Sequence, residues 1–363
     1  MVNNRRTATR LVLALFILSS IGTLSVQAQN LSAPKLSDEE SATFVLLPDP
    51  QNYTKYKTNQ PIFELMTRWV ESQIEPLNIL GVICTGDLVE QNDLVTVDGK
   101  NGDQTGRQQW QAASRAFEVL DNKVPYMIME GNHDIGYKSA EYRDTHFPEY
   151  FRVERNDTWA KHLVEVFPDA QGRPAMTNAL FEFDVPHWGK VLFITTEFTP
   201  RDEVLEWAKE RAASEKYADH LVVFMTHSYL RSNGSRIEKE SYKATPANYG
   251  EDIWQKLIYP SKNIRLVLCG HYCAIGDYEA NVGQRTDTNS VGKSVFQMMF
   301  NAQTAGGGWQ GNGGDGWLRL LEFMPDGKTI RVQTYSPLFG FSPETEHLAN
   351  RTESYDRYSI VLD

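Results

Sequence analysis

The sequence contains little cysteine. There are three such residues in 363, namely Cys84, Cys269 and Cys273. Three is an odd number, and each cysteine lies at the end of an apolar run rather than in a loop. A framework of disulfide bonds is therefore not expected to hold this fold together. We expect Cys84 and Cys269 to be small buried apolar side chains.

Basic residues are also in deficit. The chain has 36 Lys and Arg against 47 Asp and Glu, a formal net charge of −11. Without residues 1–28, which hold three arginines and no acid, 33 basic residues face the same 47 acids and the charge becomes −14. A protein this acidic lacks the basic face that binding to nucleic-acid backbones requires. We therefore expect no nucleic-acid partner. It is equally unsuited to binding as a basic layer on membrane surfaces.

Two common hydrolase signatures are missing. The chain has neither G-x-S-x-G nor H-E-x-x-H, which sets aside serine hydrolases and zinc peptidases of those types. It also has no internal repeat and no long low-complexity linker.

The first 28 residues differ from the rest. Three arginines precede the apolar run LVLALFILSSIG, which is short for a membrane span, and Val26-Gln27-Ala28 offers small residues for cleavage. These features predict a secretory signal peptide over residues 1–28 and export of the domain 29–363 to the periplasm or the cell exterior. An uncleaved N-terminal anchor is the alternative. After removal of the signal, no stable membrane insertion is expected.

Short apolar runs alternate with amphipathic segments over most of the chain. Strands are predicted at 43–49, 79–87, 124–134, 190–198, 221–227 and 264–271, and helices at 61–77, 107–123, 199–217 and 251–259. Thr199 is the expected N-cap of the third helix, with Pro200 at its first position. Continuous apolar strands between helices predict an α/β protein whose strands are buried on both faces.

The C-terminal part has a different pattern. Strand-like pieces at 294–302, 317–324, 330–336 and 358–362 are separated by Gly, Pro and Asp turns without clear helices. We expect antiparallel strands that complete a sheet. The glycine-rich GGGWQGNGGDG is expected to be an ordered loop that leads into one of them.

Residues able to bind metal follow five of the predicted strands. They are Asp49, Asp87, Asn132 with His133, His227, and His271 with Cys273. The carboxyl ends of strands in an α/β sheet line one rim, so these side chains can converge although they span more than two hundred residues. Each alone is more often a turn, cap or core residue. Together, carboxylates and imidazoles predict a site for Mn, Fe, Zn or a similar divalent ion.

The same residues resemble the calcineurin-like metallophosphoesterases. The matching motifs are Asp49-Pro50-Gln51, Gly86-Asp87, Gly131-Asn132-His133-Asp134, His227, and Gly270-His271-Tyr272-Cys273, in order over residues 43–275. The stretches RTDTNSVG, GGDGWLRLLEF and TYSP also resemble an exported bacterial branch of that family.

The resemblance implies a four-layer α/β/β/α sandwich with two divalent metal ions at the rim. Asp87 would bridge both ions. One ion would add Asn132, His227 and His271, and the other Asp49, Gln51 and Cys273. A hydroxide bridging the ions would attack the phosphorus of a small-molecule phosphomonoester or phosphodiester. His133 would serve as general acid for the leaving group, and Asp134 would orient His133.

Two positions depart from the family pattern, which has histidine where this chain has Gln51 and Cys273. A glutamine oxygen is a neutral, weaker ligand, and a thiolate is soft and negative. Three interpretations remain open. Gln51 and Cys273 both bind the second ion, or both support the ligands while Asp49 and Asp87 hold that ion, or the second ion is absent. Cys273 is equally well read as a structural thiol.

Two functions are compatible with this pattern. The first is an exported metal-dependent phosphoester hydrolase, a phosphatase or phosphodiesterase. The alternative is a catalytically impaired relative that binds metal or a ligand through one altered metal site. The substrate is expected to be set by loops such as 91–108, 138–180 and 305–316, whose sequences show no decodable pattern, and the oligomeric state is not encoded in any motif.

Overall fold

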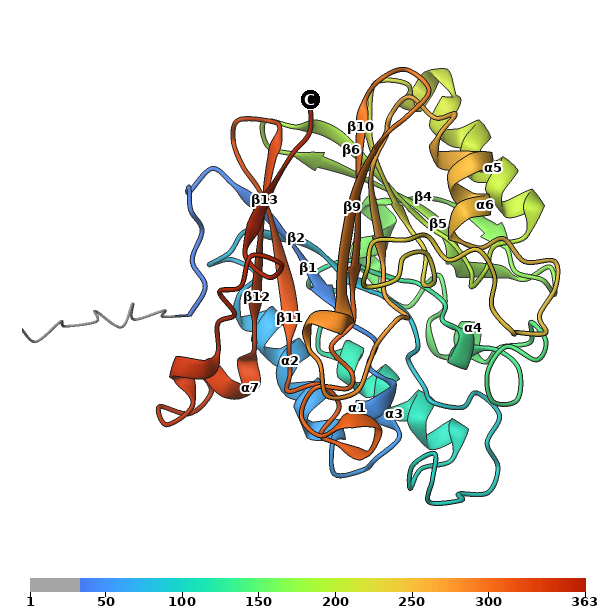
Figure 1. Ribbon diagram of the computed structural model, residues 1–363, viewed down its shortest axis with the longest axis vertical. Helices are drawn as coiled ribbons and strands as arrows, with labels where there is room; N and C mark the ends of the chain where they lie inside the picture. Colours follow the sequence, from blue (N-terminus) through green and yellow to red (C-terminus); the bar gives the residue numbers. More distant parts are fainter. Residues whose placement is uncertain (1–32) are drawn as a thin grey trace, which may run out of the picture. The chain divides into compact units, whose positions relative to one another are not determined.

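The computed structural model describes residues 33–363, so the predicted signal peptide lies outside the described residues. Two sheets dominate this part of the chain (Figure 1). The six-stranded sheet has the order β13-β12-β11-β1-β2-β3, with bounds Tyr358–Val361, Thr329–Tyr335, Leu318–Phe323, Ala42–Leu47, Ile79–Cys84 and Tyr126–Ile128. The seven-stranded sheet has the order β4-β5-β6-β7-β8-β10-β9, with bounds Leu163–Pro168, Pro174–Val185, Gly189–Thr195, Leu221–Met225, Ile264–Cys269, Ser294–Phe300 and Val282–Thr288.

The central strands of the seven-stranded sheet are buried on both faces. In β6, Val191 and Phe193 join the larger apolar core, whereas Leu192 and Ile194 join the second one. The same alternation runs through β7 and β8, because successive side chains of a strand point to opposite faces. This explains why the sequence shows continuous apolar runs at these positions.

The two sheets pack face to face through aromatic side chains. The ring of Phe44 in β1 lies 5.2 Å from that of Phe183 in β5 and 4.6 Å from that of Phe193 in β6. Truncating such a fully buried phenylalanine to alanine costs about 3–5 kcal/mol of stability. The larger core therefore lies mainly between the sheets.

Helices cover the outer faces. The core of the six-stranded sheet includes α2 (Gln60–Ser72) and α3 (Gly106–Glu118), and the second core includes α5 (Asp202–Ala213) and α6 (Gly250–Ile253) with the π-helical turn Trp254–Ile258. Figure 1 shows these two pairs on different sides of the sheets. The predicted α/β/β/α sandwich is thus confirmed. Besides several 3-10 turns, the described chain has three further short α-helices: α1 (Gln51–Thr54), α4 (Phe147–Tyr150) and α7 (Pro337–Gly340).

The prediction for the C-terminal strands is correct in part. Strand β11 runs antiparallel to β1, and β12 and β13 follow it antiparallel. The segment 294–302 behaves differently, because β10 lies in the other sheet and pairs parallel with β8. Its antiparallel partner β9 was not predicted, since VGQRTDT has little apolar character.

Two further local expectations are wrong. The segment 138–180 contains β4 and the start of β5 rather than only loop. Helix α5 begins at Asp202 with Arg201 as N-cap, whose side chain makes no capping bond, while Thr199 has a φ of +40° and lies outside the helix. Among the described residues, no helix has the length and apolar character needed to cross a membrane.

Parallel pairing explains where the site forms. Strands β1, β2 and β3 are parallel in one sheet, and β6, β7, β8 and β10 are parallel in the other. Their carboxyl ends therefore collect at one rim of each sheet, and the residues that follow them can meet.

Candidate metal centre

Asp87 lies at the centre of the site. It follows β2, is almost fully buried and has a φ of +51°. Its Oδ1 accepts the backbone N–H of His133 at 2.9 Å, and its Oδ2 accepts the side-chain amide of Gln51 at 3.0 Å. The same Oδ2 lies 3.2 Å from Nε2 of His227. Residues from three separate strand ends thus meet at this one carboxylate.

Glycines make this close approach possible. A Cβ on Gly131 would stand 2.1 Å from Oδ1 of Asp87, and one on Gly270 would stand 2.3 Å from Oδ1 of Asp49. Gly86 has a φ of +102°, which other residues rarely adopt. The glycines of the three strand-end motifs are therefore required by the space around the carboxylates.

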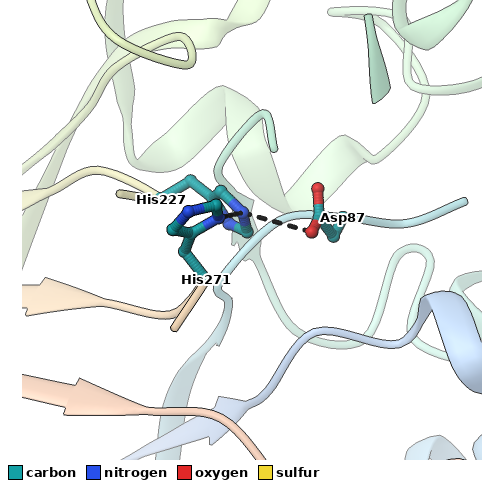
Figure 2. Close-up of side chains that lie close together, drawn as sticks. All are labelled: Asp87, His227 and His271. Carbon is teal, nitrogen blue, oxygen red and sulfur yellow. Dashed lines mark hydrogen bonds and ion pairs between the residues drawn. The ribbon is translucent and has the colours of Figure 1, made fainter. Parts of the chain in front are cut away.

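Asp87, His227 and His271 form the group in the described chain best arranged to hold a metal ion. One ligand atom from each lies within 4.8 Å of the others, and the His227 ring lies between His271 and the Asp87 carboxylate, in contact with both (Figure 2). Asn132 belongs to the same group, because its Oδ1 lies 3.1 Å from Nε2 of His227. We call Asp87, Asn132, His227 and His271 the first metal position.

Each histidine of this position has its outer nitrogen occupied. Nδ1 of His227 donates to the carbonyl of Thr85 at 2.7 Å, which leaves Nε2 facing Asp87. Nε2 of His271 lies 2.9 Å from Oε1 of Glu240, which leaves Nδ1 facing His227 at 3.2 Å. Such bonds fix the tautomer and ring orientation that a metal ligand needs.

Glu240 was not anticipated from the sequence. It lies in the long segment after β7, where no motif or periodicity marks it, and its other oxygen accepts the hydroxyl of Ser228 at 2.9 Å. Burial opposes its ionisation, but the hydrogen bond and charge of His271 outweigh that effect and lower the pKa of Glu240. The carboxylate behind His271 is therefore charged.

The carboxylates create a field that favours cations. Burial by itself lowers the pKa of His227, but the charges of Asp87 and Asp49 outweigh it and raise that pKa to about 10. Burial opposes ionisation of Asp87 as well, and the attraction of His227 and His133 nevertheless lowers its pKa. A bound metal ion would take the place of the proton in this balance.

The sequence assigns Asp49, Gln51, Asp87 and Cys273 to a second metal ion, and we call Asp49, Gln51 and the shared Asp87 the second metal position. Oδ1 of Asp49 accepts the hydroxyl of Thr85 at 2.5 Å, and Oδ2 accepts the side-chain amide of Asn301 at 2.6 Å. Burial raises the pKa of Asp49 to about 6, despite the opposing charge of His227. This carboxylate is thus fixed by protein donors on both oxygens.

Gln51 supplies an oxygen that suits a metal. Its side chain is buried, and Oε1 has no hydrogen-bond partner among the described residues. An unpaired buried carbonyl oxygen is costly unless a ligand completes it. Together with the carboxylates, imidazoles and Asn132, it gives a donor set that fits divalent metal ions.

Cys273 is engaged by a residue that the sequence did not single out. Its Sγ accepts the side-chain amide of Gln303 at 3.3 Å. Burial is the largest cause that raises the pKa of this thiol, and the negative charge of Asp49 adds to it. Oε1 of Gln303 is buried and unpartnered among the described residues, like that of Gln51. Asn301 and Gln303 both follow β10 at the shared rim.

His133 is held by the backbone. Its Nδ1 donates to the carbonyl of Glu90 at 2.6 Å, so Nε2 is the ring nitrogen left for chemistry. Burial lowers the pKa of His133, but the charges of Asp87 and Glu90 and the hydrogen bond to the Glu90 carbonyl together raise it overall. His133 is therefore held beside the metal ligands with its Nε2 open.

The expected role of Asp134 needs correction. Its carboxylate accepts the backbone N–H of Gly131 at 2.8 Å and that of Val89 at 3.2 Å, and burial raises its pKa to about 8. In the described structure the Glu90 carbonyl, not Asp134, makes the hydrogen bond that orients the His133 ring. Asp134 instead ties the turn that carries Asn132 and His133 to the segment after Asp87.

With this geometry, the sequence can be compared with known proteins. The profile of the calcineurin-like phosphoesterases matches residues 43–274, more than half of the chain. The chain belongs to the calcineurin-like phosphoesterase family. Membership implies bound divalent metal ions, and Asp87, His227 and His271 can hold one.

Individual relatives are distant. An uncharacterised Bacillus subtilis protein, YvnB, is 28% identical over 327 residues, covering 88% of this chain and 22% of YvnB. This chain thus spans about a fifth of that relative's length. A dimetal phosphatase from Danio rerio is 10% identical with a TM-score of 0.47, covering 89% of this chain and 99% of that one. GAP50 of Plasmodium, described as an anchor in the inner membrane complex, is 13% identical with a TM-score of 0.44, and the match covers 89% of each chain.

Proposed function

We propose that this protein is a metal-dependent hydrolase of small-molecule phosphoesters, either monoesters or diesters. The observation that carries the proposal is the convergence of Asp87, His227 and His271 within 4.8 Å, next to a histidine outside the ligand group. A protein that only bound metal would have no need of that histidine, His133, with its Nε2 left open.

Two sets of side chains would bind the two metal ions. Asp87, Asn132, His227 and His271 would hold one ion, and Asp49, Gln51 and Asp87 would hold the other. When bound, two such ions neutralise phosphoryl charge and make a water molecule nucleophilic near neutral pH.

His133 gives a proton to the leaving group. Its Nδ1–H is committed to the Glu90 carbonyl, so the proton that leaves must come from Nε2. The backbone N–H of His133 also bonds to Asp87, which ties the position of the acid to the metal centre. A positioned general acid contributes roughly 10²–10⁴-fold to such a reaction.

Cys273 stands beside the second metal position as a neutral thiol rather than as a ligand. The support is the hydrogen bond that the Gln303 side-chain amide donates to its Sγ. Thiolates, not thiols, bind metals, so the protein oxygens of Asp49, Asp87 and Gln51 are left to hold the second ion. If they fail to hold it, the alternative of an impaired metal-binding relative gains support.

The direct test is hydrolysis of an aryl phosphomonoester and an aryl phosphodiester by purified protein loaded in turn with Mn²⁺, Fe²⁺ and Zn²⁺. We expect turnover with at least one ion, loss of turnover after chelation, and recovery when that ion is restored. The Asp184→Asn variant, altered at an exposed acid, serves as the matched control for Asp87→Asn. Metal binding without turnover of either ester by any loaded form would favour the non-catalytic alternative.

We also propose that the domain acts after export. The support is the arginine-led apolar segment in residues 1–28 and the acidic charge of the remainder. N-terminal sequencing of the protein recovered outside the cytoplasm checks this, and a chain that begins after Ala28 is the expected result. A full-length chain found only in the cytoplasm would contradict it.

A further inference from the structure

A large cavity begins one residue beyond Cys273 and Gln303 along the chain. It has a volume of about 700 Å³ and lies between the segment after β8, the glycine-rich segment after β10 and residues 347–353. Ala274 and Thr304 line it, and they directly follow Cys273 and Gln303 in the chain. The Thr304 hydroxyl donates to the Ala274 carbonyl at 2.7 Å, so the two segments form one wall that continues from the metal centre.

Much of this wall is apolar and open. Ile275 is 60% exposed and Leu348 is 47% exposed, which is unusual for large aliphatic side chains. Ile275 lies against Gly308, where an added Cβ would stand 3.3 Å from its Cγ2. The Ile275 side chain and the glycine backbone beside it thus form a surface against which the flat face of a ligand can pack.

The charges of the cavity disfavour anions. Asp277, Asp315 and Glu353 line it, and the lining arginine, Arg351, is already occupied. Its Nε bonds to Asp356 at 2.6 Å, its Nη2 bonds to Glu353 at 2.9 Å, and its guanidinium lies 3.4 Å from the centre of the Tyr278 ring. A second phosphate or a carboxylate would meet three acidic side chains here, and the lining residues include no lysine or unpaired arginine to offset them.

We propose that this cavity binds the alcohol portion of the phosphoester and selects an uncharged, hydroxyl-bearing group the size of a sugar or a nucleoside. The carboxylates accept hydroxyl hydrogens, and the Ile275 and Leu348 surface packs against the apolar face of the ring. A volume of this size is in the range of small-molecule sites, roughly 300–1,000 Å³. The inference rests on the proposed function, because the metal centre would hold the phosphoryl group.

The test compares kcat/KM of the metal-loaded enzyme for four phosphomonoesters: methyl phosphate, a hexose 6-phosphate, a nucleoside 5′-monophosphate and 3-phosphoglycerate. We expect the hexose or the nucleoside ester to exceed methyl phosphate and 3-phosphoglycerate by on the order of tenfold or more, as loss of a few pocket contacts implies. Which of the two esters is preferred identifies the alcohol. Ile275→Asp should abolish most of this preference. Val291→Asp, at a valine that is 57% exposed in the turn between β9 and β10, should retain it.

Equal preferences in the two variants, or 3-phosphoglycerate turned over as well as the hexose ester, would overturn the inference. If none of the four monoesters is hydrolysed and the aryl phosphodiester is not hydrolysed either, the proposed function fails, and binding of the alcohols alone decides the question. Saturation-transfer NMR with methyl glucoside and with uridine should then show contact in the wild-type protein that Ile275→Asp removes and Val291→Asp keeps. No contact with either alcohol would refute the cavity's role.

Discussion

The first metal position takes two imidazoles and an amide oxygen, and each imidazole is locked by a partner behind it, the Thr85 carbonyl for His227 and Glu240 for His271. The second position has no imidazole. Its carboxylate Asp49 is fixed by protein donors, but Gln51 Oε1 has no partner among the described residues. Neutral amide oxygens bind divalent ions more weakly than imidazoles do. We therefore expect the first position to bind a divalent ion more tightly than the second.

The largest expected effect is at the shared carboxylate. Asp87→Asn should remove bound metal from both positions and lower kcat/KM by on the order of 10³-fold or more, because several kcal/mol of charge stabilisation are lost. Elemental analysis and phosphoester turnover measure the two effects. Two ions per chain in Asp87→Asn would show that the positions do not share this ligand. The control variant Asp184→Asn should keep both ions and full activity.

Replacing His133 should lower the rate of hydrolysis without changing the metal content of the protein. His133→Asn is expected to lower kcat about 10²–10⁴-fold for an alkyl phosphoester while the metal content stays at the wild-type value. The loss should be much smaller for a nitrophenyl ester, whose leaving group needs no proton. An equal loss for both esters would argue against proton donation by this residue.

Glu240, the hydrogen-bond partner of His271, should affect the affinity of the first position for metal. Glu240→Ala removes the carboxylate that holds His271, and such losses weaken metal binding roughly 10–100-fold. Glu240→Gln keeps an acceptor for the ring N–H and should recover most of the affinity. Glu238→Gln, two residues away and exposed, is the matched control. Calorimetric titration of metal-free protein distinguishes these variants, and an unchanged affinity in Glu240→Ala would remove Glu240 from the account.

The smallest effect is expected at the cysteine. Cys273→Ser should change metal content and kcat/KM by no more than about threefold, which is under 1 kcal/mol. Cobalt-substituted protein gives an independent check, because a thiolate ligand adds a strong near-ultraviolet charge-transfer band. Appearance of that band in wild-type protein, and its loss in Cys273→Ser, would make Cys273 a ligand after all.

The strand-end argument located most of the site from sequence, since parallel pairing brings the residues after β1, β2, β3, β7 and β8 to one rim. It missed Asn301 and Gln303 for an identifiable reason. The segment 294–302 was assigned to the antiparallel tail, whereas β10 pairs parallel with β8, and a parallel assignment would have placed both residues at the same rim.

Other features had no local signal to find. Glu240 lies in a loop whose position depends on tertiary packing, and nothing in its neighbouring sequence marks it as the partner of His271. The backbone carbonyl of Glu90 orients His133, and a backbone group leaves no signal in the pattern of side chains. Sequence patterns therefore identify the groups that face the metal more readily than the groups that hold them in place.

Stepwise calorimetric titration of metal-free protein with Mn²⁺, followed by elemental analysis, is the most direct test of the unequal metal centre. We predict two ions per chain that bind in two resolved steps, with the tighter step lost in His271→Ala and both steps kept in Cys273→Ser. Binding of one ion only, or loss of the tighter step in Cys273→Ser, would contradict the assignment of ligands to the two positions.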